Sequence, residues 1–159
     1  MSDDTATREH LAWLLEGGHA HTKFDEAIRG LPLNRAGERP AGSPYSAWEL
    51  LEHMRIAQHD MLQFSRSAEH VSPEWPSGYW PSTPRPKDEA EWNQSVRGFR
   101  KDLADFVALV RDPKQDLNRK FPWGEGQSLF REALQIADHN SYHLGQLVLV
   151  RRLLGEWGS

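Results

Sequence analysis

Two histidines in the last quarter of the chain are the residues best able to do chemistry. His139 and His143 lie four residues apart in the segment IADHNSYHLGQLVLV, which covers residues 136–150. On a helix, side chains at this spacing lie one above the other, with roughly 5–6 Å between their Cβ atoms. Two imidazoles placed in this way can bind one metal ion. The spacing therefore indicates either a metal site or two polar residues within a helical core.

A third histidine occupies an equivalent place on another predicted helix. His53 lies between Leu50 and Ala57 on a stripe that is otherwise apolar. If the two stripes face each other in a helix bundle, three imidazoles come together. Three neutral nitrogen ligands with open coordination positions are typical of a catalytic metal site rather than a closed structural one. The alternative is that His53 is a core histidine that is hydrogen-bonded and binds no metal.

Composition limits the function classes. The 159 residues are enough for one domain, covering residues 1–159, with a core of its own. The net charge of −4 does not indicate a nucleic-acid-binding surface. There is no cysteine, which excludes disulfides and a cysteine nucleophile, so any thiolate must come from another molecule. No segment is long and apolar enough to span a bilayer, and the N-terminus lacks the apolar region of a signal peptide. We expect a soluble, cytoplasmic protein that binds neither nucleic acid nor membrane.

The elements that must position the histidines are predicted to be four long helices. Apolar residues recur at three- and four-residue steps over about 5–28, from Ser46 onward, over about 87–111 and over about 128–154. Ser46 and Glu49 form a capping-box pattern at the start of the second helix. Four amphipathic helices in one domain predict an all-α fold, a four-helix bundle with long crossover loops.

The segment 70–86 between the second and third helices contains five prolines, so it is predicted to be irregular. Its aromatic residues Trp75, Tyr79 and Trp80 suggest a loop that packs on the helices. These aromatics either wall an apolar pocket or simply attach the loop to the bundle.

Other polar residues are candidates for supporting roles. His21 and Asp25 lie where the inner stripe of the first predicted helix becomes polar, and antiparallel packing would bring that end near His53. We predict His21 as a pocket residue, either a proton shuttle or a substrate contact; the alternative is a helix end that meets solvent. Gln146 is placed to orient a ligand imidazole. The remaining histidines have no predicted partner or leave the ligand face, and we expect His10, His19 and His70 on the surface.

Two segments carry a resemblance to a known family. YSAWELLEHM, residues 45–54, and DHNSYHLGQL, residues 138–147, are similar to the corresponding motifs of the DinB superfamily, including its YfiT-type metalloproteins. The resemblance covers nearly the whole chain. It implies a four-helix bundle, a homodimer and a divalent metal held by His53, His139 and His143.

The resemblance also implies an activity. In DinB relatives a metal of this kind works with a low-molecular-weight thiol in S-transfer, and others are regarded as metal-dependent hydrolases. We therefore expect a thiol S-transferase acting on a small-molecule substrate, with a hydrolase, or a non-catalytic stress-related bundle that acts through a partner, as alternatives. Zn or Ni is the expected ion, and three imidazoles also suit Fe, Co or Cu.

Overall fold

The structure, a computed structural model, describes residues 4–17 and 20–158 and is helical. The helices are α1 (Thr5–Glu16), α2 (Phe24–Ile28), α3 (Leu33–Ala36), α4 (Ala47–Arg66), α5 (Glu89–Arg111) and α6 (Leu129–Leu153), with a 3-10 turn, η1 (Ser77–Tyr79), between α4 and α5. Among the described residues, β pairing is limited to an isolated bridge between Lys120 and Ser128. The predicted all-α class is confirmed. None of the described helices is both long and apolar enough to cross a membrane.

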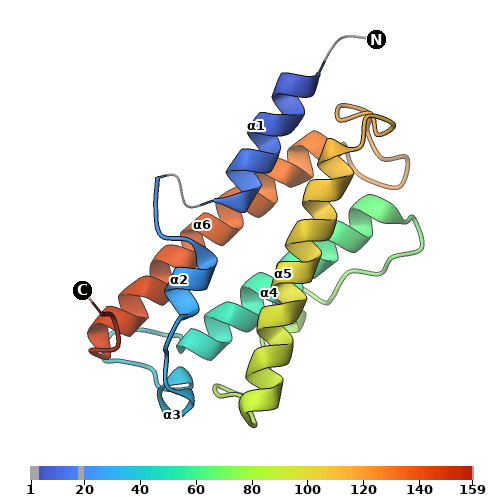
Figure 1. Cartoon of the computed structure of the whole chain (residues 1–159). Coiled ribbons are helices and arrows are strands. Elements are labelled where there is room, and N and C mark those ends of the chain that lie inside the picture. Colours follow the sequence, from blue (N-terminus) through green and yellow to red (C-terminus); the bar gives the residue numbers. More distant parts are fainter. Residues whose placement is uncertain (1–3, 18–19, 159) are drawn as a thin grey trace.

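The four long helices α1, α4, α5 and α6 form the bundle (Figure 1). Both α1 and α4 pack against α5 and α6. The α4 and α5 helices run in the same direction: Gln58 bonds to Phe99, and about two turns further along Arg66 pairs with Asp105. The chain therefore does not alternate simply up and down.

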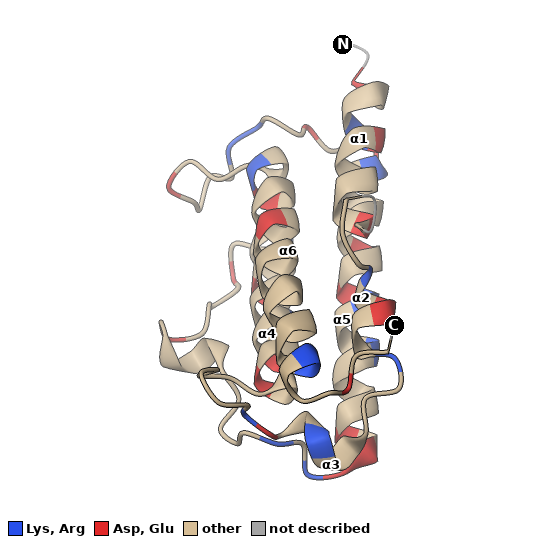
Figure 2. Ribbon diagram, turned by 90° about the vertical axis from the view of Figure 1, so that its left-hand side faces the viewer, with Lys and Arg blue, Asp and Glu red and all other residues tan. Residues whose placement is uncertain are grey.

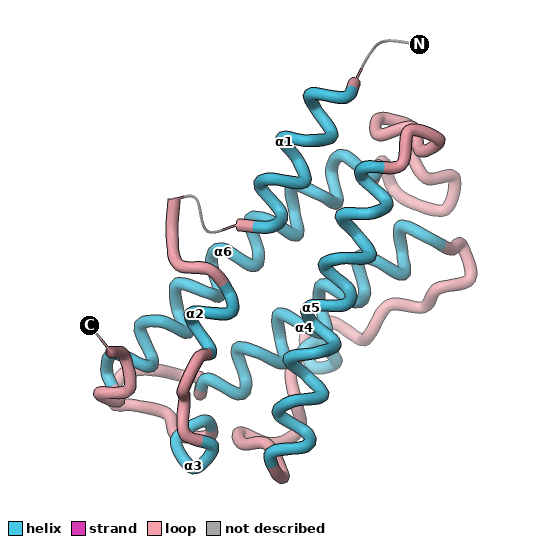
Figure 3. Tube along the Cα trace, in the orientation of Figure 1, coloured by secondary structure: helices cyan, strands magenta, loops and turns pink. Residues whose placement is uncertain are grey.

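The parallel pairing of α4 and α5 explains the long proline-rich connection between them. The 20 residues of α4 span roughly 30 Å. The chain has to return over that distance before α5 begins, and segment 67–88 does so along the outside of the bundle (Figures 1 and 3). This return path brings the aromatic residues of the loop to the side of α4.

The prediction of one helix over residues 5–28 is wrong. The α1 helix ends at Glu16, and Gly17 follows with φ 65° and ψ −171°, a conformation that is essentially restricted to glycine. The Gly17 N–H closes the helix by donating to the carbonyl oxygens of Trp13 and Leu14. A short separate helix, α2, forms only from Phe24.

The other helix starts agree closely with the prediction because side chains cap them. In the capping box of α4, the Glu49 N–H donates to Ser46 Oγ (3.2 Å) and the Ser46 N–H donates to Glu49 Oε2 (2.8 Å). The α5 helix begins at Glu89, two residues later than predicted, because the Asp88 side chain is its N-cap. Ser128 caps α6 in the same way.

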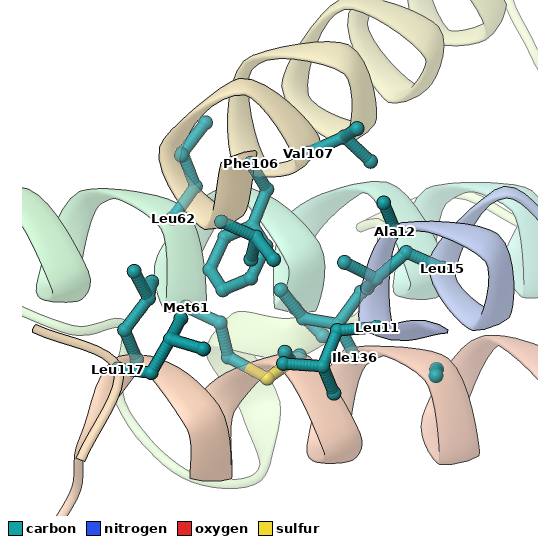
Figure 4. Close-up of a cluster of buried hydrophobic side chains, with 14 residues drawn as sticks. Leu11, Ala12, Leu15, Met61, Leu62, Phe106, Val107, Leu117 and Ile136 are labelled. Carbon is teal, nitrogen blue, oxygen red and sulfur yellow. The ribbon is translucent and has the colours of Figure 1, made fainter. Parts of the chain in front are cut away.

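The core consists of two apolar clusters, one toward each end of the bundle. In the first, shown in Figure 4, side chains of α1, α4, α5 and α6 meet around Phe106. The second is centred on Trp48 and Leu147. Between the clusters, α4 and α6 contribute polar side chains instead of apolar ones, and His53 and His143 are among them.

Acidic and basic residues both occur along the outer faces of α1 and α5 (Figure 2). Arg111 on α5 pairs with Glu9 and Glu16 on α1. Exposed pairs of this kind contribute little, about 0–1 kcal/mol each. The antiparallel contact of α1 with α5 therefore depends mainly on the apolar cluster beneath it.

Candidate metal centre

The three predicted ligand histidines converge in the polar layer between the two apolar clusters. His53 comes from α4, and His139 and His143 come from successive turns of α6. The Nε2 atom of His53 lies 3.1 Å from the Nε2 atoms of both His139 and His143. One nitrogen from each residue can be chosen so that all three lie within 4.8 Å of one another. Within the described chain this is the group of residues placed to hold a metal ion.

Hydrogen bonds on the outer side of two rings fix which nitrogen faces inward. His53 Nδ1 donates to the backbone carbonyl oxygen of Tyr79 (2.8 Å), and His143 Nδ1 donates to Gln146 Oε1 (2.8 Å). Because a carbonyl oxygen only accepts, each neutral ring carries its proton on Nδ1 and a lone pair on Nε2. Two nitrogen lone pairs 3.1 Å apart repel each other, and a cation that both nitrogens coordinate would remove this repulsion. The predicted role of Gln146 in orienting an imidazole agrees with this contact.

Burial keeps these rings in the form that binds metal. It lowers the pKa of His53 and of His143. The pKa of His139 falls to about 4, first because the ring is buried and then because His143 and His53 are close. All three side chains are therefore neutral at pH 7, which is the state in which an imidazole is a ligand.

His139 differs from the other two in its surroundings. Its Nδ1 atom is buried and has no hydrogen-bond partner within normal limits. The neighbouring Asn140 opposes the lowering of the His139 pKa only weakly. The Asn140 amide is instead directed to Gln58 Oε1 (2.8 Å), and Gln58 in turn donates to the Phe99 carbonyl (2.7 Å). The His139 ring is thus the least restrained of the three.

The loop between α4 and α5 supplies an aromatic wall. The Trp80 ring stacks on His53 with 4.0 Å between ring centroids and 4° between planes. Tyr45 stacks on Trp80 at 4.2 Å. The expected packing of the loop is found for Tyr79 and Trp80, whereas Trp75 is 75% exposed and touches only the edge of Tyr79 among the aromatic rings described.

His21 is not brought together with the three histidines. The side chain is exposed, and its Nε2 lies 3.1 Å from Ser141 Oγ. Ser141 is two residues from both His139 and His143, hence about 200° round the helix from each. His21 therefore lies on the opposite side of α6. Asp25, expected beside it, pairs with Arg100 of α5.

An open cleft on the outer face of α6 borders one of the three histidines. It has a volume of about 550 Å³. Its lining residues are Phe130, Arg131, Leu134, Gln135, Asp138, His139 and Tyr142. Of the three histidines, only His139 lines this cleft. A separate cavity on the other side of α6 borders Asn140 and Ser141 but none of the three histidines.

Sequence reasoning missed the residues that hold the loop in place. The expectation that His70 is a surface residue without a partner is wrong, since His70 Nε2 lies 2.7 Å from Asp60 Oδ1. The Tyr79 hydroxyl donates to the other oxygen of Asp60 (2.7 Å). One signal was available: Asp60 is seven residues after His53 and so lies on the same face of α4. His10 is exposed as expected, and His19 lies outside the described residues.

Comparison with known proteins supports the resemblance. A sequence model of the DinB superfamily matches residues 18–147, which include all three histidines and the loop that covers them. No curated protein and no solved structure gives a significant match. The match covers most of the chain and agrees with the helical fold and with the placement of the histidines. The chain belongs to the DinB superfamily.

Proposed function

We propose that this protein is a metal-dependent enzyme that transfers a group to or from an external low-molecular-weight thiol. One observation carries the proposal: three neutral imidazoles direct nitrogen atoms to a common point, and outer hydrogen bonds fix two of them in the metal-binding tautomer. Three protein ligands leave further coordination positions open. Zn or Ni is the expected ion, with Fe, Co and Cu also compatible with three nitrogen ligands.

When bound, a divalent ion supplies Lewis-acid chemistry, which lowers the pKa of a thiol or water that occupies an open position. In an S-transfer, the thiol loses its proton and its sulfur bonds to the electrophilic atom. The leaving group departs with the bonding electron pair and takes up a proton. Because the chain has no cysteine, the thiol is a second substrate. A reducing compartment such as the cytoplasm would supply it, so cytoplasmic location is part of the proposal.

The residues of the chain would contribute binding and exclusion of water. His53 and His143 are held by Tyr79 and Gln146, so the ligand geometry exists before substrate arrives. Trp80 covers one face of His53 and keeps bulk water from that side. The cleft beside His139 provides room for a small substrate. His21 faces another side of α6, so its position supports a role at the metal less than a substrate contact on that side.

Hydrolysis is the alternative that the same site supports. A water molecule in the open position would replace the thiol as nucleophile, with the same three ligands. A non-catalytic bundle, in which the ion only joins α4 to α6, is the second alternative. Addition of thiol separates S-transfer from the two alternatives: it should change the visible spectrum of the Co-loaded protein only if the open position accepts sulfur.

A homodimer is the further part of the proposal. The α6 helix exposes four large apolar side chains, Leu134, Tyr142, Leu149 and Leu153. Their spacings of eight, seven and four residues place them on one face of the helix. Such a stripe is a surface for a second copy of the chain, which would then also border the cleft that Leu134 and Tyr142 line.

The test of the metal site is the metal content of the untagged protein, measured by mass spectrometry beside two variants. We expect about one divalent ion per chain, its loss in His143→Ala and its retention in His59→Ala. His59 is a matched control because it is on α4 but bonds to Asp102 of α5. If the wild-type protein binds no Zn or Ni even after reconstitution, the enzymatic proposal is wrong.

A further inference from the structure

We propose that Asp60 is a positioning residue that sets the orientation and tautomer of His53 by holding the Tyr79–Trp80 segment against it. The inference rests on the proposed function, because it assigns a residue to the support of the same site. Asp60 does not touch His53 itself: it lies two turns further along α4. Its influence passes through the loop that returns over the bundle.

Both oxygens of Asp60 are used to fasten this loop. Oδ1 lies 2.7 Å from His70 Nε2, at the start of the loop, and Oδ2 accepts from the Tyr79 hydroxyl (2.7 Å), nine residues later. The Asp60 side chain is 11% exposed and that of His70 18%. A buried carboxylate with two close donors is a specific anchor, because charge-assisted hydrogen bonds are short and roughly twice as strong as neutral ones.

The anchored residue is also the residue that orients the ligand. The Tyr79 side chain is fixed by Asp60, and its backbone carbonyl accepts from His53 Nδ1 (2.8 Å). The next residue, Trp80, lies flat on the His53 ring. Fixing the Tyr79 ring therefore fixes both the hydrogen-bond acceptor and the aromatic wall of His53.

Asp60 lies near a second buried acidic residue, so its carboxylate depends on the two hydrogen-bond donors of the loop. Glu132 on the facing helix α6 is buried, and it interacts unfavourably with Asp60. Burial and Asp60 raise the pKa of Tyr79 to about 12, so its hydroxyl keeps its proton and remains a donor at all ordinary pH values. If the loop moved away, Asp60 would lose both hydrogen bonds, and the free-energy cost of breaking them opposes loop opening.

Asp102 offers a matched control. It also accepts from a histidine, His59 Nδ1 at 2.9 Å, and its side chain is 12% exposed. The carboxylate is therefore of the same kind and burial as Asp60, but it joins α5 to α4 rather than holding the loop. Asp60→Ala and Asp102→Ala each remove a buried carboxylate and its contact with a histidine, and only the first also removes the bond to Tyr79 and with it the support of His53.

Two measurements test the inference. Long-range ¹H–¹⁵N NMR of the metal-free protein reports which ring nitrogen of His53 carries the proton. Competition with a chromogenic chelator reports the Zn affinity. In wild type and Asp102→Ala we expect the proton on Nδ1 and equal affinity. In Asp60→Ala we expect a mixture of tautomers and a 10–100-fold weaker affinity, the loss typical of removing the support of a metal ligand.

Unchanged tautomer and affinity in Asp60→Ala would overturn the inference. If Asp60→Ala does not fold, Tyr79→Phe decides in the same way, since it removes only the hydroxyl that Asp60 accepts from. A wild-type protein that binds no Zn would contradict the proposed function instead, and the NMR comparison in the metal-free protein would still decide the role of Asp60.

Discussion

His53, His139 and His143 differ most in what their outer nitrogens contact. The outer nitrogen of His53 meets a backbone carbonyl and that of His143 a glutamine amide, while that of His139 has no full hydrogen bond. The spacing of the two histidines on α6 and the stripe on α4 predicted that the three side chains could meet, and the family resemblance added that they would be metal ligands. The hydrogen-bond acceptor for His53 could not be predicted from the sequence. It is a backbone carbonyl, which every residue has, and Tyr79 comes close to His53 only because of the path that the loop takes.

The buried side chain of Glu132 should make the stability of the protein depend on pH. It is a buried carboxyl on α6, and burial, followed by the charge of Asp60, raises its pKa above the ordinary value of 4.5, while Arg131 acts in the opposite direction. The pKa of Glu132 is therefore higher in the folded than in the unfolded chain. Below about pH 4 the carboxyl is protonated in both states and does not destabilise the fold. As the pH rises through the folded-state pKa, the buried carboxyl becomes charged and the free energy of unfolding falls. Glu132→Gln should therefore melt at a higher temperature than wild type at pH 7.

Calorimetry between pH 4 and pH 8 measures this difference. Each 1 kcal/mol corresponds to about 2–4 °C in a chain of this size. The gap between Glu132→Gln and wild type should close toward pH 4, and Glu125→Gln, at an exposed position, should show no comparable gap. A gap that is the same at all pH values would mean that the carboxyl charge is not its cause.

Among the elements, the helix starts were predictable and the path between them was not. Ser46, Asp88 and Ser128 are capping residues whose side chains act on the next few residues, so the signal is local. The end of α1 was missed because periodicity continues in the sequence through Gly17. The parallel pairing of α4 with α5 depends on contacts far apart in the chain, and only the length of segment 67–88 indicated that such a crossover was possible.

Two glycine substitutions should have opposite effects on helix stability. Gly17→Ala places a Cβ on a residue with φ 65°, and such a backbone costs a non-glycine residue on the order of 1–3 kcal/mol. Gly145→Ala lies inside α6 with open space around the new Cβ, where alanine is favoured by roughly 0.5–1 kcal/mol. Urea unfolding should thus place Gly17→Ala below wild type and Gly145→Ala above it. Equal shifts of the same sign would contradict this account of the end of α1.

In the molecule as a whole, the polar layer separates two apolar clusters. His53 on one helix and His139 and His143 on another meet in this layer, so a bound ion would join α4 to α6 where the apolar core is interrupted. A ligand that binds only the folded state at 100 times its Kd adds about 2.7 kcal/mol to the free energy of unfolding. Chelation should then lower the melting temperature of wild type by roughly 5–10 °C, and it should leave that of His143→Ala unchanged.

The apolar stripe on α6 predicts the oligomeric state. Leu149→Glu puts a charge in the centre of the proposed contact, where burial without a partner is costly. Sedimentation should show a dimer for wild type and for Gln94→Glu, which adds a charge on the exposed face of α5, and a monomer for Leu149→Glu. A monomeric wild type at all concentrations would remove the homodimer from the proposal.

The weak restraint on His139 has a kinetic consequence. Rotation of His53 away from the common point breaks a bond to Tyr79 and separates it from Trp80, and rotation of His143 breaks a bond to Gln146. Rotation of His139 breaks no such bond, and of the three histidines only His139 lines the cleft on α6. We therefore expect His139 to control ion exchange: it would be the last histidine to bind an entering ion and the first to release a departing one. The equilibrium affinity for the ion would then depend on all three rings, and the residence time of the ion mainly on His139.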